Sequence, residues 1–276
     1  MKRFKRFAWP YFFWMLVFIL IPIVLLFVIS FLEMRSLNFA SARFSFAAFS
    51  KTFNSVYINA FVKSIVLAAI ATAFCILIGY PLAYIVSTLN IANRFSFLLI
   101  LIMPMFTNML LRVNTINKLL RPESFLKNLF GISLNISGSE TAVVLVMVLM
   151  YLPFMVFPIF TVLEKIDPSL LEASRDLGAN NFKTFLKVTL PLSLKGISSG
   201  IIMVFLPCAT SFTIPYIVSE GKMKLIGNII EDKMGLGNVI TTDYPVGSLL
   251  SIIILIAVMG SLWLISKIDA EGETLL

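Results

Sequence analysis

The sequence contains no histidine and only two cysteines among its 276 residues. Without imidazole, histidine metal sites, Ser-His-Asp triads and histidine proton switches are excluded. The two cysteines, Cys75 and Cys208, both lie inside apolar runs. We interpret them as buried packing residues rather than as a disulfide or a metal-binding pair.

Charge is also scarce. Only 13% of the residues are charged, about half the share usual in soluble domains, whereas 59% are hydrophobic. A water-soluble protein of this length needs more charge to cover its surface. The 12 prolines and 13 glycines are incompatible with a simple coiled coil. This composition indicates an integral membrane protein.

Six apolar runs are long enough to cross a bilayer, for which a helix needs about 20 residues. The runs lack the alternating pattern of a membrane barrel, and a helix satisfies its own backbone hydrogen bonds in lipid. The predicted fold class is therefore an all-α integral membrane protein with six transmembrane helices. The predicted spans are Tyr11–Leu32, Ser64–Val86, Phe95–Leu111, Thr141–Leu163, Gly196–Val218 and Val246–Ile265.

Two features of self-sufficient transporters are missing from the sequence. None of the predicted spans contains Asp or Glu, the usual mark of proton- or ion-coupled carriers. A Gly-x4-Gly-Lys-Ser/Thr phosphate loop is missing as well, since Gly221-Lys222 is followed by Met223. We therefore expect a chain that is not an enzyme, holds no cofactor or metal, and receives energy from a separate partner.

Orientation rests on the basic cluster at Lys2, Arg3, Lys5 and Arg6, directly before the first span. The number of Lys and Arg residues does not separate the two orientations, but the first helix usually dominates topology. We therefore expect both termini in the cytoplasm. The apolar run after the cluster has about 22 residues and exceeds a signal-peptide core of about 7–15, so we interpret it as a span.

The longest predicted cytoplasmic segment is Glu164–Lys195, between spans four and five. Asp167 is suited to cap a first short helix, with Pro168 in its first turn, where a missing N–H costs nothing. Gly178 then supplies a left-handed stop. The segment therefore begins with one short, capped helix.

A second short helix follows in the same segment. Asn180 or Asn181 is suited to cap it, and we expect Pro191 to break it. The resulting helix-turn-helix at the inner membrane surface offers a compact knob to a soluble partner.

Glu172-Ala173-Ser174, Gly178 and Val188-Thr189-Leu190-Pro191 follow one another in this segment, separated by three and nine residues. The pattern resembles the Glu-Ala-Ala loop of ATP-binding-cassette (ABC) importer permeases, with departures at Ser174 and Val188. The resemblance implies a coupling helix that docks in a groove of a cytoplasmic ATPase. The implied coupling residues are Leu171, Glu172, Ala173, Ser174, Asp176, Leu177, Gly178, Ala179, Leu190 and Pro191.

Four further motifs lie at Gly79–Tyr84, Met103–Arg112, Tyr151–Pro158 and Leu225–Ile230. They resemble the PotB-type permeases of spermidine/putrescine importers. The resemblance implies a subunit that moves polyamines across the cytoplasmic membrane of a bacterium by alternating access. The implied partners are two ABC ATPase subunits that bind ATP and Mg, a second homologous (PotC-like) permease, an external polyamine-binding protein and the lipid bilayer, but no nucleic acid.

The resemblance also divides the chain. Residues 1–59 would form a tail, the first span and an outer loop, residues 60–266 the permease domain, and residues 267–276 a cytoplasmic tail. Import of another solute, such as thiamine, ferric ion or an oxyanion, stays open, as does a secondary carrier or channel. A membrane enzyme or assembly factor is disfavoured because the sequence offers no nucleophile–base or metal constellation.

Candidate pathway residues are polar and aromatic groups at membrane depth, which attract a polycation through dipoles and aromatic faces. Their alternative role is hydrogen bonding between helices. Arg112 repels a polycation, so we expect an anchoring or gating role there. Outer acids are outnumbered by outer basic residues, so the chain presents no simple cation funnel. The candidates are Thr107, Asn108, Tyr151, Thr210, Ser211, Thr213 and Tyr216.

Overall fold

The computed structural model describes residues 2–34, 42–122, 136–236 and 242–273, together with 127 and 131. Most of this part is helical, as predicted. The structure adds a short antiparallel pair of strands, β1 (Leu32–Glu33) and β2 (Arg43–Phe44). By its internal contacts the chain divides into two units, Met1–Val62 with Leu225–Val258 and Lys63–Lys224 with Met259–Leu276.

The first unit contains the N-terminal span, which is continuous although Pro22 lies within it. A π-helical turn, Leu16–Leu20, precedes the proline, and the Ile21 N–H donates to the carbonyl of Leu16. This wider turn makes room for the proline ring, which clashes with the carbonyl four residues earlier in a regular helix. The helices of this unit are α1 (Lys2–Met15), α2 (Ile21–Ser30), α3 (Ala47–Thr52), α4 (Ser55–Thr88) as far as Val62, α14 (Ile226–Lys233) and α15 (Tyr244–Glu273) as far as Val258.

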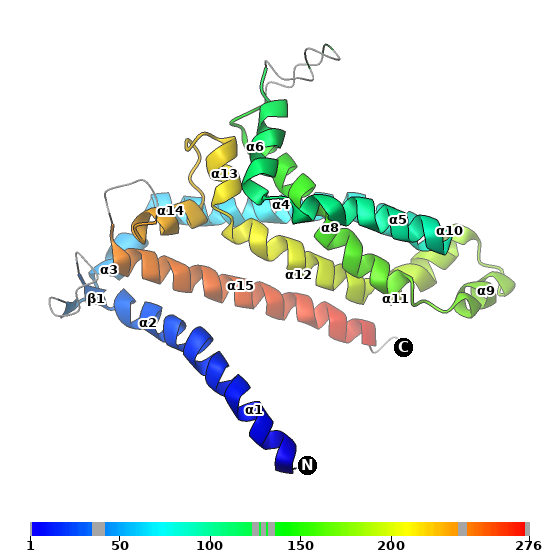
Figure 1. The fold of residues 1–276 in the computed structure, drawn as a ribbon, viewed down its shortest axis with the longest axis horizontal. Coiled ribbons are helices and arrows are strands. Elements are labelled where there is room, and N and C mark those ends of the chain that lie inside the picture. Colours follow the sequence, from blue (N-terminus) through cyan, green and yellow to red (C-terminus); the bar gives the residue numbers. More distant parts are fainter. Residues whose placement is uncertain are drawn as a thin grey trace. The chain divides into compact units, whose positions relative to one another are not determined.

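The second unit is a bundle around α8, which α6, α12 and α13 all contact (Figure 1). A 3₁₀ turn, Met103–Phe106, follows α5. The helices of this unit are α4 from Lys63 onward, α5 (Ile91–Ile102), α6 (Met109–Leu119), α8 (Glu140–Leu163), α9 (Pro168–Asp176), α10 (Asn181–Thr184), α11 (Leu190–Leu192), α12 (Leu194–Thr210), α13 (Thr213–Val218) and α15 from Met259 onward.

Two glycines bring α12 directly onto α8. A Cβ atom at Gly196 would lie 2.9 Å from the Cα of Ile159 and 2.9 Å from the carbonyl oxygen of Pro158. A Cβ atom at Gly200 would lie 2.6 Å from the Sδ of Met155. Close packing through small residues is the usual way in which membrane helices associate, because lipid gives them no hydrophobic drive to do so.

The two cysteines belong to the same bundle. Cys75 of α4 and Cys208 of α12 are fully buried free thiols, which confirms their interpretation as packing residues. The Cys75 Sγ lies 3.8 Å from the carbonyl oxygen of Val148, so α4 also packs against α8.

Within the part of the chain that the structure describes, four helices are long and apolar enough to cross a membrane. They correspond to the predicted spans one, two, four and six. If each of two bent helix pairs also forms one span, the number rises to six. The four helices are Trp9–Ser30, Ser55–Thr88, Glu140–Leu163 and Tyr244–Ile265.

The predicted third span, Phe95–Leu111, is sharply bent. The segments Asn93–Phe106 and Met109–Leu119 meet at an angle of 99°. The helix restarts at this point because the Asn108 side chain accepts a hydrogen bond from the Leu110 N–H at 2.8 Å and caps α6.

The predicted fifth span, Gly196–Val218, is also interrupted. After α12 the backbone of Ser211 is extended, and α13 begins two residues later. The second loop helix does not break at Pro191 as predicted. The bend, of 60°, lies at Ser193, between the segments Asn181–Leu192 and Leu194–Thr210.

Candidate functional site

The loop between α8 and α12, called the α8–α12 loop below, begins with a capped helix. The Asp167 side chain accepts a hydrogen bond from the Ser169 N–H at 2.9 Å, and Pro168 occupies the first turn of α9. Hydrogen bonds from the backbone and then the side chain of Ser169 hold the pKa of Asp167 below its usual range. The cap is therefore a charged carboxylate at neutral pH, and the predicted start of this helix is confirmed.

The other end of α9 is closed by Gly178. Its φ is +83°, which confirms the predicted left-handed stop. The Gly178 N–H donates to the carbonyl of Arg175 at 2.9 Å, and the Ala179 N–H donates to that of Ser174 at 3.1 Å. These two bonds form a Schellman motif, which satisfies carbonyls of the last turn that have no partner within the helix. The chain leaves α9 in one defined direction.

The second loop helix starts at Asn180, whose side chain accepts from the Lys183 N–H at 2.8 Å. The Ser174 Oγ lies 3.0 Å from the Thr184 Oγ1, and Thr184 is buried. Ser174 is one of the two departures from the Glu-Ala-Ala pattern. Here its hydroxyl makes a hydrogen bond that fixes α9 against α10.

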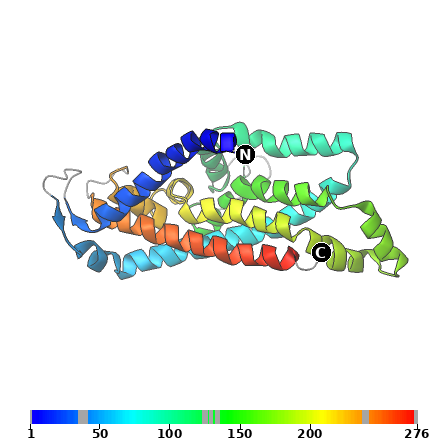
Figure 2. The same cartoon turned by 90° about the horizontal axis from the view of Figure 1, so that it is seen from below.

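The α8–α12 loop carries an exposed apolar surface. In Figures 1 and 2, α9 lies beyond the ends of α8 and α12, beside α10. Leu177 is 90% exposed and Phe182 is 68% exposed, and both lie outside the predicted spans, where lipid would cover apolar side chains. We call Leu170, Leu177, Phe182 and Leu186, which are all exposed, the loop tip.

The structure divides the predicted coupling residues into two groups. Glu172, Ala173 and Asp176 are exposed on α9. Leu190 and Pro191 instead lie in α11, where they are partly buried. The remaining predicted residues, Leu171, Ser174, Leu177, Gly178 and Ala179, lie in α9 or the turn that ends it. Of the predicted coupling residues, only those of α9 and its turn lie beside the exposed Leu177.

The bend at Ser193 is bound to α4. The Tyr80 hydroxyl lies 2.9 Å from the Ser193 Oγ, and both residues are buried. The rings of Tyr80 and Tyr84 meet the Phe185 ring edge-on, at centroid distances of 5.7 and 5.6 Å. The α8–α12 loop is thus attached to the bundle on the α4 side.

Sequence reasoning missed Arg94, in the first turn of α5. Its Nη1 lies 2.7 Å from the Glu164 Oε1 at the end of α8. Its Nη2 donates to the carbonyls of Ser87 at 2.7 Å and Leu89 at 3.1 Å. The only signal in the sequence was a single Arg and a single Glu at the borders of adjacent apolar runs.

The candidate pathway residues lie at the breaks and on α8. Thr107 and Asn108 form the first break, where Thr107 donates to the Pro104 carbonyl at 2.7 Å. At the second break, Thr210 donates to the Leu206 carbonyl at 2.9 Å. These hydrogen bonds are local, and so they do not join the two breaks.

The remaining candidates surround the second break or belong to α8. Ser211 is buried, Thr213 is partly buried and Tyr216 is half-exposed. The Tyr151 ring on α8 packs beside Phe154 at a centroid distance of 6.1 Å. The short helices that follow the breaks, α6 and α13, contact each other and α8. Non-helical backbone at membrane depth is tolerated where protein or a cavity surrounds it.

The family model of binding-protein-dependent transport system inner membrane components matches residues 76–267. This chain belongs to that family. It is therefore a multi-pass component of the inner membrane with a role in transport. The matched part of this inner membrane component includes the α8–α12 loop and both breaks.

Relatives of this inner membrane component carry a more specific name. The chain is 35% identical over 206 residues to the spermidine/putrescine transport system permease protein PotB of Haemophilus influenzae, covering 72% of this chain and 71% of that protein. It is 33% identical over 222 residues to PotB of Escherichia coli, covering 78% and 79%.

Two solved structures share its fold. A bacterial ABC transporter involved in the import of the acidic polysaccharide alginate aligns with a TM-score of 0.72 at 15% identity, covering 99% of this chain and 98% of that one. A bacterial alginate ABC transporter in complex with an alginate pentasaccharide-bound periplasmic protein aligns with a TM-score of 0.75 at 14% identity, covering 97% and 94%.

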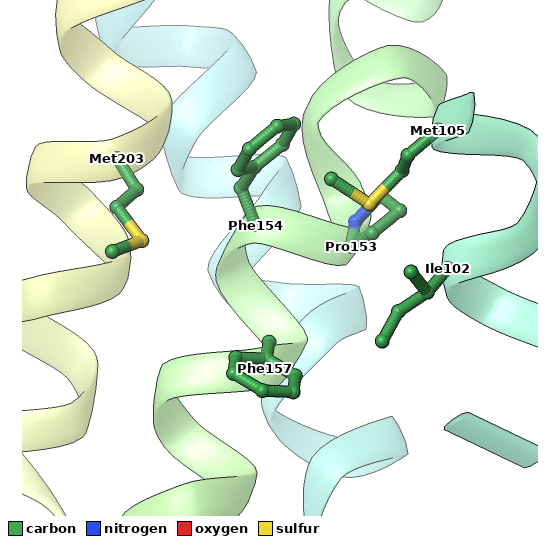
Figure 3. Close-up of a pocket in the computed structure, with 6 residues that line it drawn as sticks. All are labelled: Ile102, Met105, Pro153, Phe154, Phe157 and Met203. Carbon is green, nitrogen blue, oxygen red and sulfur yellow. The ribbon is translucent and has the colours of Figure 1, made fainter. Parts of the chain in front are cut away.

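The inner membrane component also contains an apolar pocket of about 410 Å³. Figure 3 shows Phe154 and Phe157 of α8 between Met203 of α12 and Ile102 of α5. Met105 and Pro153 complete the lining. None of these residues belongs to the candidate pathway set, although that set was drawn from polar and aromatic groups and the pocket lining includes Phe154 and Phe157.

Proposed function

We propose that this chain is the permease subunit of an ABC importer that carries polyamines such as spermidine and putrescine. The PotB relatives at 33–35% identity support the substrate class. The alginate transporter structures, at 14–15% identity, support the fold and carry no argument about the solute.

The α8–α12 loop is the proposed contact through which a partner ATPase drives transport. An exposed apolar tip held by two capped helices suits a groove on a soluble partner, and Leu177 at 90% exposure is the observation that supports this proposal best. The partner would be an ATPase subunit that binds ATP and Mg. Its groove would grip α9 differently before and after ATP binding, because only differential contact shifts a conformational equilibrium.

Six spans result if each bent pair crosses the membrane once. Both termini and α9 would then lie on one side, and the basic cluster before the first span favours the cytoplasm as that side. A cysteine introduced by Asn180→Cys should react with a membrane-impermeant thiol reagent only after the cells are opened, and one introduced by Lys222→Cys should react in intact spheroplasts. The native Cys75 and Cys208 are fully buried and give little background. Labelling of Asn180→Cys from outside would overturn this orientation.

In the proposed cycle, movement of the loop opens and closes a path through the membrane alternately to the two sides. The breaks at Thr107–Asn108 and at Ser211 are the proposed moving points of this path, with Tyr151, Thr210, Thr213 and Tyr216 near it. A second homologous permease would supply the other half of the path. An external binding protein would deliver the substrate, by analogy with the alginate transporter that was solved in complex with a periplasmic protein.

The test is purification of the tagged chain from its native membrane, followed by ATP hydrolysis assays. An ABC ATPase should copurify, and hydrolysis should rise when the binding protein is loaded with spermidine or putrescine. Stimulation by thiamine, ferric ion or an oxyanion instead would still support an ABC importer, but one that carries that solute rather than polyamines. Transport without a copurifying ATPase would favour a secondary carrier or channel.

A further inference from the structure

The Arg94 guanidinium connects the ends of three helices on the side of the bundle that carries the α8–α12 loop. It lies in the first turn of α5, pairs with Glu164 at the end of α8, and donates to two carbonyls at the end of α4. Its Cζ also lies 5.9 Å from the ring centre of Phe160 on α8. Its side chain is only 21% exposed, so solvent screens these interactions less than those of a surface pair.

The two charges of this pair stand at the unfavourable ends of their own helices. A cation in the first turn of α5 opposes the helix dipole, and so does an acid at the C-terminal cap of α8. Neither charge therefore stabilises the helix that carries it. The Arg94 guanidinium instead interacts with neighbouring segments, namely Glu164, the Phe160 ring and the carbonyls that end α4.

From this geometry we propose that Arg94 is a positioning residue for energy coupling. It holds the ends of α4, α5 and α8 together at the point where the α8–α12 loop begins. A displacement of the loop then reaches α5, which leads through the 3₁₀ turn Met103–Phe106 to the break at Thr107–Asn108. The inference rests on the proposed function, because it explains how movement of the loop is passed to the membrane path.

The role requires a guanidinium rather than any cation. Arg94 uses one nitrogen for the carboxylate and another for the two carbonyls. A lysine carries its donors on a single nitrogen and lacks this planar fork, so it retains the charge and loses part of the bridge.

The experiment measures substrate transported per ATP hydrolysed by the reconstituted complex with its ATPase and spermidine-loaded binding protein. For Arg94→Met we expect normal copurification of the ATPase and a ratio lowered about fivefold or more. Arg94→Lys should give an intermediate ratio. Glu164→Gln, which leaves both carbonyl bonds in place, should lower the ratio less than Arg94→Met. A purely structural role would lower the amount of complex and leave the ratio unchanged.

Arg121→Met is the matched control. Arg121 pairs with Glu220 through the same atom types at 2.6 Å, between the ends of α6 and α13, and is 49% exposed. Its loss should leave the ratio unchanged. A wild-type ratio in Arg94→Met would overturn the inference, and if that variant fails to accumulate, a wild-type ratio in Arg94→Lys would overturn it. Absence of polyamine transport by the unmodified complex would instead contradict the proposed function.

Discussion

The hydroxyl of Ser174 lies 3.0 Å from that of Thr184 and joins the two helices of the α8–α12 loop. Ser174→Ala leaves the buried Thr184 hydroxyl without this partner, a loss that costs about 1–3 kcal/mol in a buried site. We predict faster hydrogen exchange of the α9 and α10 amides and weaker retention of the ATPase.

The double variant Ser174→Ala with Thr184→Val is the control for this prediction. Replacing both partners by apolar groups removes the unsatisfied hydroxyl and can be nearly neutral. Exchange in the double variant should therefore be slower than in Ser174→Ala alone. Equal or faster exchange would show that the hydroxyl pair does not set the packing of these helices.

Gly178 offers a test of the loop geometry without a change in packing. A Cβ atom there would meet nothing within 4 Å, so the effect of substitution comes from φ alone. A left-handed backbone costs a residue with a side chain roughly 1–2 kcal/mol, and a β-branched residue suffers most. Because 1.4 kcal/mol is about tenfold in affinity, Gly178→Val should weaken ATPase retention about tenfold at a normal protein level. Gly178→Asn should be milder, because Asn tolerates this region.

Gly138 is the matched control for Gly178. Its φ is +86°, and a Cβ atom there would also meet nothing within 4 Å, but it lies before α8, outside the α8–α12 loop. Gly138→Val should introduce the same backbone strain and leave ATPase retention unchanged. Equal loss of retention in both variants would mean that general destabilisation, rather than the direction of α9, explains the effect.

The close approach of α12 to α8 predicts a stability defect at Gly196. An alanine Cβ would lie 2.9 Å from backbone atoms of Ile159 and Pro158, which cannot move aside as a flexible side chain can. Gly196→Ala should therefore destabilise the purified protein by about 1–3 kcal/mol, measured as a lower midpoint of thermal unfolding in detergent.

Gly260 provides the comparison within a helix. A Cβ atom at this position of α15 would meet nothing within 4 Å. Gly260→Ala should be neutral or stabilise by about 0.5–1 kcal/mol, because alanine loses less conformational entropy than glycine in a helix. An unchanged unfolding midpoint for Gly196→Ala would show that α12 and α8 separate readily.

The spans and the loop caps could be predicted because each depends on a short stretch of sequence. Uninterrupted apolar runs identify the helices of spans one, two, four and six. Asp167, Gly178 and Asn180 act on backbone groups within a few residues, so capping rules suffice for α9 and α10. The same rules failed at Pro191, since the preceding π-helical turn, Phe185–Thr189, accommodates the proline.

The breaks in spans three and five could not be predicted from hydropathy, because only short polar stretches, Thr107–Asn108 and Thr210–Ser211, interrupt the apolar runs there. Proline was a poor guide to their position. Helix α8 contains Pro153 and Pro158 and still runs from Glu140 to Leu163. The first break lies instead at Asn108, where a side-chain cap competes with the continuing helix.

The Arg94–Glu164 pair could not be predicted from the sequence, for a different reason. Its members are 70 positions apart in the sequence, and only the arrangement of α4, α5 and α8 brings them together. Each charge alone has the pattern of a residue at a membrane border. Its role follows from partners on other helices, which local rules do not describe.

Uptake of radiolabelled solutes by proteoliposomes tests the central claim most directly. The liposomes would contain this chain, its partner permease and the ATPase, with the binding protein added outside and ATP enclosed. We predict ATP-dependent accumulation of spermidine or putrescine, and none of thiamine or ferric ion. Accumulation that persists without ATP, or that is confined to a solute other than a polyamine, would contradict the account.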